Sequence, residues 1–381
     1  MSKWTKVRLG DYIQECLERN KSNFEIPVYS VTNSNGFCTE YFSKEVASKE
    51  KTSYKIVKKG YFAYNPSRIN VGSIDWLREE TVVIVSPLYN VFSVKSGLNQ
   101  QYLYYYLKSP IGLYYIKELS TGSVRDNLKF STLANFSIPF PPLEIQQQIA
   151  SNVDKVIRTI ELCNQIIEKL DLLVKVKFVE MFGEPVLNTK GWKMVKIGDI
   201  VTEVKYGTSR PAVNAGKYPY LRMNNITYDG YLDLTDLKRI DVPENEIEKC
   251  VVHKGDVLFN RTNSIELVGK TCVFDKSEDM VIAGYIIRIR LNKDMLPLVL
   301  SYFMNTDSLK KKLRNMAKGA VNQANINAQE LKAIEIYLPP LELQKQFSDF
   351  VEQTEKSKSA VKQVLEKAEA LEKALMQKYF R

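Results

Sequence analysis

The sequence predicts an α+β protein with two globular units of mixed α/β structure, two long helices and an internal pseudo-two-fold repeat. Short motifs occur twice in the same order, which is typical of a duplicated structural unit. Short runs rich in β-branched and aromatic residues are punctuated by Gly, Pro and Asn, as in strands joined by turns. Each copy then ends in a long stretch with heptad-like spacing, which favours paired helices.

Three motifs carry the repeat, and their order is the same in both halves of the chain. With each first copy followed by its second, they are WTKVRLGD at 4–11 and WKMVKIGD at 192–199, KGYFAYN at 59–65 and KGDVLFN at 254–260, and GSVRDN…STLANFSIPFPPLEIQQQ at 122–148 and GAVNQANINAQELKAIEIYLPPLELQKQ at 319–346.

The first globular unit is expected to occupy residues 1–140. Its predicted strands are Val28–Val31, Lys55–Val57, Tyr61–Tyr64, Thr81–Val85 and Val91–Val94. A single tyrosine-rich helix is predicted over Gln101–Leu119, where packing in the core explains the aromatic residues better than a platform for stacked bases. The second globular unit, 184–338, should repeat this plan, with a helix near 298–317.

The first long helix is expected within 141–183, because Leu143 follows three prolines and Gly183 ends the pattern. The second is expected within 339–381. The apolar seam of the first helix includes Ile149, Val153, Val156, Ile160, Ile167 and Leu170. In the second helix the seam is poorer. Phe347 and Val351 are followed by polar Thr354 and Lys358, and the stripe resumes at Val361, Val364, Ala368, Leu371 and Leu375, which predicts a register adjustment.

Two apolar stripes of this length must be buried against another surface. The simplest solution is an antiparallel coiled coil of the two helices within one chain, which would create a pseudo-dyad between the repeats. The alternative is that each helix pairs with another chain.

The composition favours a folded protein with a polyanionic partner. The 381 residues carry a net charge of +10, which suits nucleic acid but also fits an ordinary basic surface. Five scattered cysteines without a CxxC pair indicate reduced thiols and a cytoplasmic location. The N-terminal MSKWTKVRLG lacks a signal-peptide apolar stretch, and the longest apolar run is broken by polar residues, so no membrane association is expected.

No catalytic or metal site is predicted. One histidine, His253, excludes histidine-rich metal clusters. Gly269-Lys270-Thr271 lacks the earlier glycine of a phosphate loop, and Asn65-Pro66-Ser67-Arg68 lacks the second proline and aromatic residue of a methyltransferase loop. Asp236-Leu237-Lys238, which fits the end of a nuclease motif, is too short to distinguish from chance.

Several loops are dense in side chains that hydrogen-bond bases and phosphates. Asn and Gln can read adenine and Arg can read guanine, whereas Ser, Thr and Lys mostly contact the backbone; the same residue types also form ordinary turns. The DNA-binding candidates are Tyr29, Ser30, Thr32, Asn33, Ser34, Asn35, Arg68, Asn70, Arg125, Tyr206, Thr208, Ser209, Arg210, Arg222, Asn224, Asn225, Arg261, Asn263, Lys318, Asn322 and Gln323.

The chain resembles the specificity subunits of type I restriction-modification systems. The resemblance is carried by Pro141–Ile149 (PPLEIQQQI), Pro339–Phe347 (PPLELQKQF), Val28–Asn33, Lys205–Ser209 and Gly319–Gln323. It covers essentially the whole chain, and the repetition of these motifs in order makes it specific.

The resemblance implies that each globular unit is a target-recognition domain reading one half of an asymmetric, bipartite site in double-stranded DNA. The helices would be spacers that also dock methyltransferase (modification) subunits. A restriction subunit with translocase activity would join through them. S-adenosylmethionine, ATP and Mg would belong to these partners, with no cofactor in this chain. A self-contained methyltransferase or nuclease with degenerate motifs is the alternative, and a coiled-coil scaffold with incidental charge is a third possibility.

Overall fold

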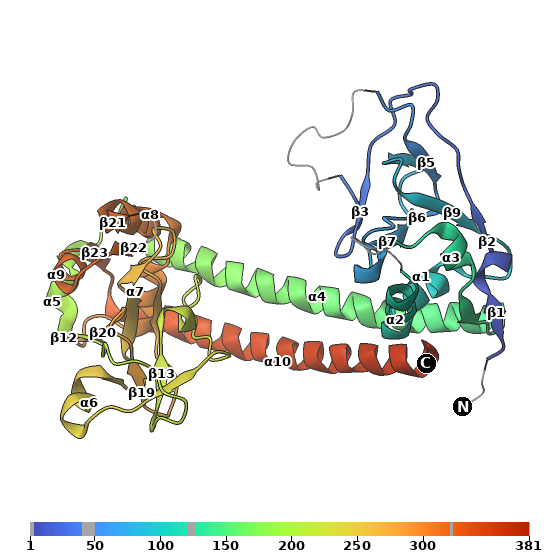
Figure 1. Ribbon diagram of the computed structural model, residues 1–381. Helices are drawn as coiled ribbons and strands as arrows, with labels where there is room; N and C mark the ends of the chain where they lie inside the picture. Colours follow the sequence, from blue (N-terminus) through green and yellow to red (C-terminus); the bar gives the residue numbers. More distant parts are fainter. Residues whose placement is uncertain (1–3, 40–49, 121–126, 321–322, 381) are drawn as a thin grey trace. The chain divides into compact units, whose positions relative to one another are not determined.

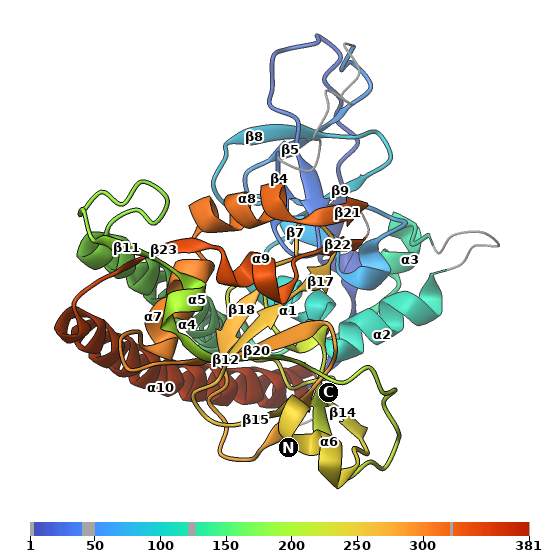
Figure 2. The same ribbon diagram turned by 90° about the vertical axis from the view of Figure 1, so that its left-hand side faces the viewer.

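The computed structural model describes residues 4–39, 50–120, 127–320 and 323–380 (Figures 1 and 2). The chain forms two compact units, one of Met1–Asn164 with Lys362–Arg381 and one of Gln165–Val361. Two long helices, α4 (Leu143–Phe182) and α10 (Leu341–Phe380), each begin in one unit and end in the other. Each unit therefore contains a segment of both helices.

The described part of the first unit contains small antiparallel sheets and three short α-helices. Its strands are β1 (Lys6–Arg8), β2 (Ile13–Glu15), β3 (Ser30–Thr32), β4 (Gly36–Cys38), β5 (Lys55–Lys58), β6 (Phe62–Tyr64), β7 (Ile74–Trp76), β8 (Val82–Val85), β9 (Asn90–Val94) and β10 (Ser137–Pro139); its α-helices are α1 (Gln100–Lys108), α2 (Pro110–Leu119) and α3 (Phe130–Ala134), and η1 (Leu9–Asp11) and η2 (Ile69–Val71) are 3-10 turns.

The second unit also combines short strands and short helices (Figure 2). Its strands are β11 (Lys193–Lys196), β12 (Val201–Tyr206), β13 (Tyr218–Leu221), β14 (Lys238–Ile240), β15 (Val251–Val252), β16 (Val257–Asn260), β17 (Thr262–Asn263), β18 (Thr271–Val273), β19 (Met280–Ile282), β20 (Ile286–Leu291), β21 (Lys318–Ala320), β22 (Gln323–Asn325) and β23 (Glu335–Leu338); its helices are α5 (Ile197–Ile200), α6 (Glu244–Cys250), α7 (Pro297–Met304), α8 (Asp307–Met316) and α9 (Ala328–Lys332), with the 3-10 turn η3 (Met223–Asn225).

The sheet topology confirms the predicted repeat and the α+β class. The first unit has a four-stranded sheet of order β2-β9-β6-β7, and the second has β12-β20-β16-β18, which is the same order in equivalent strands. In both units the first strand pairs antiparallel with the strand that precedes the prolines, as β1 with β10 and β11 with β23. Around this shared plan each unit adds different strands, β3–β4 and β5–β8 in the first and β14-β13-β19-β15 and β17-β22-β21 in the second.

The repeated Leu/Ile-Gly-Asp motif marks a close approach between two segments of each unit. Leu9 and Ile197 are fully buried. A Cβ on Gly10 would lie 2.8 Å from the carbonyl oxygen of Ala134, and one on Gly198 would lie 3.2 Å from that of Lys332. Glycine therefore lets the first turn of each unit pack against the end of α3 or α9.

A break replaces the single helix predicted over Gln101–Leu119. Ser109 caps α2 by accepting a hydrogen bond from Gly112 N through its hydroxyl, and Pro110 occupies the first helical turn. A proline at that position starts a new helix instead of continuing the old one. The same division separates α7 from α8. Core packing is confirmed for Tyr102, Tyr105 and Tyr106 of α1, which are buried, whereas Tyr114 of α2 is 55% exposed.

A buried glutamine fixes the start of each long helix. Gln146 and Gln344 are both fully buried. The Gln146 amide accepts from Asn99 N (2.8 Å) and donates to the carbonyls of Gly97 (3.1 Å) and Pro141 (2.9 Å). In the second unit Gln344 accepts from Leu296 N (2.8 Å) and donates to the carbonyls of Asp294 and Pro339 (2.9 Å each). We call the three hydrogen bonds of each buried glutamine the glutamine lock. They explain why glutamine recurs after the repeated Pro-Leu-Glu.

Each hydrophobic core takes side chains from both long helices. In the first unit Ile149 and Val153 of α4 share a core with Met376 and Phe380 of α10, and the Phe380 ring centroid lies 5.5 Å from that of Tyr102. In the second unit Phe178 and Phe182 of α4 each lie 5.4 Å from Phe347 of α10, measured between ring centroids. Each core is thus completed by the end of the helix that begins in the other unit.

The buried stripe of α10 runs without the predicted register adjustment. One series of buried or half-buried positions recurs every three or four residues along the helix and consists of Phe347, Val351, Thr354, Lys358, Val361, Leu365, Ala368, Glu372, Leu375 and Tyr379. The prediction is wrong for Leu371 and Val364, which are 48% and 49% exposed. Their apolar character drew them into the predicted seam, whereas Thr354 and Lys358 are buried with polar partners. In α4, Ile149, Val153 and Val156 are buried and Ile160, Ile167 and Leu170 are half-buried.

Lys310, the first residue of a basic stretch that could have met phosphate, is buried in the second unit. Its ammonium donates to the carbonyl of Tyr228 (2.5 Å) and lies 3.6 Å from the centroid of that ring. Burial lowers the pKa of Lys310 to about 8, because the charged form loses its hydration. This lysine is therefore held inside the fold by the Tyr228 segment.

Replacing Gln344 by Leu should destabilise the second unit by about 2–4 kcal/mol, because one backbone N–H and two carbonyls lose their partners. Urea denaturation of the Gln344→Leu variant measures this. Gln346→Leu, an exposed position on the same helix, is the matched control and should change the free energy of unfolding by less than about 0.5 kcal/mol. Equal effects of the two variants would contradict the role of the lock.

The buried Lys310 predicts a pH dependence. Between pH 8 and its ordinary pKa of 10.5, the unfolded chain binds more protons at this site than the folded chain, so folding stability rises with pH across that window. Measured against Lys310→Met, the wild type should gain on the order of 2 kcal/mol from pH 7.5 to pH 10. The exposed Lys311→Met should show no such difference, and a flat wild-type profile relative to Lys310→Met would refute the assignment.

Candidate nucleic-acid interface

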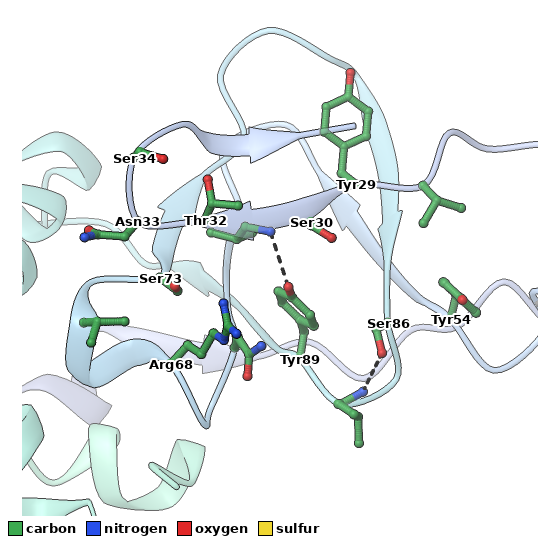
Figure 3. A pocket seen from close by; sticks show the side chains of 15 residues that line it. Tyr29, Ser30, Thr32, Asn33, Ser34, Tyr54, Arg68, Ser73, Ser86 and Tyr89 are labelled. Carbon is green, nitrogen blue, oxygen red and sulfur yellow. Dashed lines mark hydrogen bonds between the residues drawn. The ribbon is translucent and has the colours of Figure 1, made fainter. Parts of the chain in front are cut away.

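A recess of about 510 Å³ in the first unit collects most of its predicted DNA-binding residues (Figure 3). They come from β3 and the turn after it and from the loop before η2, and they are Tyr29, Ser30, Thr32, Asn33, Ser34 and Arg68. Asn33 and Ser34 are exposed, whereas Ser30 is 4% exposed and contributes only to the wall. The structure therefore brings together two loops that are separate in the sequence.

The β3–β4 turn is held in place by specific hydrogen bonds. Asn35 N donates to Thr32 Oγ1 (3.1 Å), and Lys108 Nζ of α1 donates to the carbonyl of Asn33 (2.9 Å). The Tyr29 hydroxyl donates to Glu80 Oε1 (3.4 Å), and burial together with Glu80 raises the pKa of Tyr29. The amide side chains of Asn33 and Asn35 project from an exposed turn with a fixed backbone.

Asp75 connects this turn to the four-stranded sheet. It is 4% exposed, and its Oδ2 accepts from Phe37 N of β4 (3.2 Å) while Oδ1 lies 3.0 Å from the Arg78 guanidinium. The Arg78 guanidinium lies 4.9 Å from the ring centroids of both Trp76 and Tyr104. A buried carboxylate paired in this way orients the hairpin against the core of the unit.

In the second unit one group of predicted residues gathers at the β17-β22-β21 sheet. Asn263, Gln323 and Lys318 each lie on a different strand of it. The Arg261 guanidinium lies 4.9 Å from the centroid of the Tyr206 ring, and the Tyr206 hydroxyl accepts from Ala328 N (2.8 Å). Lys318 is exposed and pairs with Glu330 (2.6 Å). Stacked arginine and amide side chains suit contacts with bases and phosphates.

The other group is tied to acidic residues. Arg210, which follows Thr208 and Ser209, pairs with both carboxylate oxygens of Glu246 (3.0 and 2.8 Å). Arg222 contacts Asp236 Oδ2 at 2.6 Å. The pair with Arg210 lowers the pKa of Glu246. Lys238, 3.0 Å from Asp236 Oδ1, together with Arg222 lowers the pKa of Asp236. Both arginines are therefore engaged by carboxylates within the fold.

Asn225 is a wrong prediction. It is 1% exposed, its Oδ1 accepts from Arg222 N (2.9 Å), and its Nδ2 donates to the carbonyl of Asp233 (2.8 Å). With both ends of the amide engaged inside the fold, it is a structural turn residue. Asn224 beside it is exposed, and Asn70 lies in η2 next to the recess loop. Arg125 and Asn322 lie outside the described residues.

The sequence reasoning missed several walls of the recess. Tyr54, Ser73 and Tyr89 line it from other segments of the first unit, and the Tyr89 hydroxyl accepts from Val31 N (3.4 Å) (Figure 3). Each is a polar or aromatic residue beside a strand, which gives no local signal of a site. Only the folded arrangement identifies them.

The motif that imitates a phosphate loop has a structural role. Lys270 of Gly269-Lys270-Thr271 is 7% exposed and donates to the carbonyl of Met223 (2.7 Å), so it cannot reach a phosphate.

Among the described residues, no three His, Cys, Asp or Glu side chains gather as metal ligands. Within that same part of the chain, every helix is too short or too polar to cross a bilayer.

Several known proteins that are similar to this chain are specificity subunits of type I restriction enzymes. The relatives include the type I restriction enzyme EcoKI specificity subunit of Escherichia coli K12, 26% identical over 66% of this chain and 58% of that protein. A putative MjaX specificity subunit of Methanocaldococcus jannaschii is 30% identical over 50% of this chain and 45% of that protein. The matched regions thus span only about half the length of these relatives.

Solved structures share the fold. The S subunit of a type I restriction-modification system from M. genitalium has a TM-score of 0.58 and 16% identity, covering 99% of this chain and 96% of that one. A chain of another type I restriction-modification system has a TM-score of 0.57 and 20% identity, covering 100% and 98%. At these identities the likeness concerns the fold alone.

The family comparison covers both repeats. Residues 1–172 and 189–371 each match the model of the type I restriction-modification DNA specificity domain. Each match takes in one globular unit of the repeat and most of the long helix that follows it. The chain belongs to the family of type I restriction-modification DNA specificity domains, and it carries two of them.

Proposed function

We propose that this protein is the DNA-recognition subunit of a type I restriction-modification complex, with each globular unit reading one half of a bipartite site in double-stranded DNA. The observation that carries the proposal is the repeated four-stranded sheet with different strands added around it in each unit. The two units share one framework but differ in the surfaces that are candidates for contacting DNA. We therefore expect the two half-sites to differ in sequence, which makes the whole site asymmetric.

The long helices set the distance between the half-sites in this proposal. We divide the chain into a first recognition domain (1–140), a first spacer helix (141–183), a second recognition domain (184–338) and a second spacer helix (339–381). An antiparallel coiled coil of the helices is supported within each unit, where the beginning of one helix and the end of the other share a core. A helix of 40 residues is about 60 Å long, enough for half-sites about one DNA turn, roughly 34 Å, apart.

Exposed apolar residues on the helices provide docking surfaces for methyltransferase subunits. Ile166 and Leu173 of α4 are 43% and 47% exposed. When the helices are aligned at Leu143 and Leu341, their equivalents in α10 are Val364 and Leu371, which are exposed to a similar extent. An exposed apolar patch marks an interaction site, and its repetition favours two copies of the partner per chain.

The chemistry then belongs to the partners. The methyltransferase subunits would bring S-adenosylmethionine, and a restriction and translocase subunit joining through them would use ATP and Mg. This chain would be non-catalytic and cytoplasmic, where its five free cysteines stay reduced. A self-contained enzyme is not favoured by any feature of the candidate interface.

Exchanging residues 184–338 for the same domain of a relative should change one half of the methylated sequence and leave the other half intact. The test is to map methylated adenines genome-wide after co-expression with the methyltransferase subunit in a methylation-free host. Exchange of 1–140 is the reciprocal control. A change in both half-sites, or a site without two parts, would overturn modular recognition.

The docking patches predict a stepwise loss of the partner. Ile166→Glu with Leu173→Glu should reduce the methyltransferase copies per chain from two to one, because a carboxylate in an apolar contact is costly to desolvate. Adding Val364→Glu and Leu371→Glu should remove the second copy, as measured by native mass spectrometry. Asn164→Glu with Lys362→Glu, exposed on another face of the helices, should leave both copies bound. Full binding by the fourfold variant would refute the assignment.

A further inference from the structure

Lys358 places a buried charge in the apolar stripe of α10. It is 6% exposed. Its ammonium forms an ion pair with Asp171 of α4, lies 3.7 Å from Glu355 Oε1, and sits 4.6 Å from the centroid of the Tyr231 ring. A lysine removed from water in this way requires a charged partner and good geometry. All of these residues belong to the second unit.

Tyr231 extends this contact to a loop of the second recognition domain. Its hydroxyl donates to Asp171 Oδ1 (3.3 Å), and burial raises its pKa, so the hydroxyl keeps its proton. One helical turn further along α4, Lys175 Nζ lies 2.7 Å from Asp229 Oδ1. The loop is therefore attached to the helix at two positions four residues apart.

The same loop is continuous with a candidate reading turn. Thr227 N donates to the carbonyl of Tyr231, and Asp233 N donates to the carbonyl of Asn225, both at 2.9 Å. These bonds close the loop directly after Arg222 and Asn224. A shift of Tyr231 along the helix would therefore carry the reading turn with it.

The repeat supplies an internal comparison. In the alignment of the helices at Leu143 and Leu341, the equivalents of Lys358 and Asp171 are Ile160 and Glu369, which cannot form an ion pair. Ile160 is half-buried, so the stripe accommodates an apolar residue at this position. Since apolar replacements of buried ion pairs are often neutral or stabilising, helix pairing alone does not account for Lys358.

We propose that Lys358, Asp171 and Tyr231 form a positioning cluster that fixes the second recognition domain on the helices and thereby sets the spacing accepted between the two half-sites. The inference rests on the proposed function. These are positioning residues, because they touch neither the bases nor a reacting group. Their removal should relax the spacing while the sequence of each half-site stays the same.

The test uses the complex with its methyltransferase subunit and DNA in which the two half-sites are separated by the native spacer or by one base pair more or less. The variants are Lys358→Met with Asp171→Leu, and Tyr231→Phe, which keeps the ring. Lys356→Met with Glu352→Leu removes an exposed ion pair of α10 and is the matched control. Initial methylation rates and the melting temperature are measured for each.

The preference for the native spacer should fall about tenfold in the double variant, the scale of a small misplacement, and severalfold in Tyr231→Phe. The control should keep the wild-type preference. An unchanged spacer preference in an assembled variant would overturn the inference. If the double variant does not assemble, the spacer preference of Tyr231→Phe provides the test. A wild-type complex that methylates no two-part site would instead refute the proposed function.

Discussion

The structure depends on the uninterrupted stripe of buried positions along each long helix. Isolated helices are only marginally stable in water, and an amphipathic helix gains most of its stability by covering its apolar face. In both units that cover comes from a globular core together with the other helix. The paired glutamine locks and the aromatic residues around Phe347 and Phe380 fix where each helix begins and ends relative to a core.

What repeats in this chain is the framework that attaches each domain to the helices. The pairing of the first and last strands, the four-stranded sheet and the buried glutamine are the same in both units. What differs is the set of strands added around that framework. Attachment demands close packing, which tolerates little change, whereas exposed turns can vary without loss of stability. On the proposed function, this division would let one scaffold present two different surfaces to DNA.

The long helices and the repeat were predictable because their signals extend over many residues. Three-residue strands such as β1 and β10 carry no such signal. The tyrosine-rich pattern continues past Pro110, so the sequence predicts one helix where this proline starts a second. The sequence does not predict the stripe of α10 correctly, because the burial of Lys358 depends on Asp171, which is distant in sequence and lies on the other helix. Asn225 and Asn224 look equivalent in sequence, and only the folded turn distinguishes the buried structural amide from the exposed one.

The paired arginines of the second unit connect its electrostatics to selectivity. An exposed ion pair such as Arg210–Glu246 contributes little to stability. Little free energy is therefore lost when the arginine leaves the carboxylate and binds the edge of a correctly placed guanine. The same carboxylate reduces the attraction of the arginine for phosphates at any sequence, which is the main source of non-specific binding. For a chain with a net charge of +10, such pairing weakens indiscriminate contacts more than specific ones. On the proposed function, Glu246 and Asp236 therefore raise the ratio of specific to non-specific binding without contacting DNA themselves.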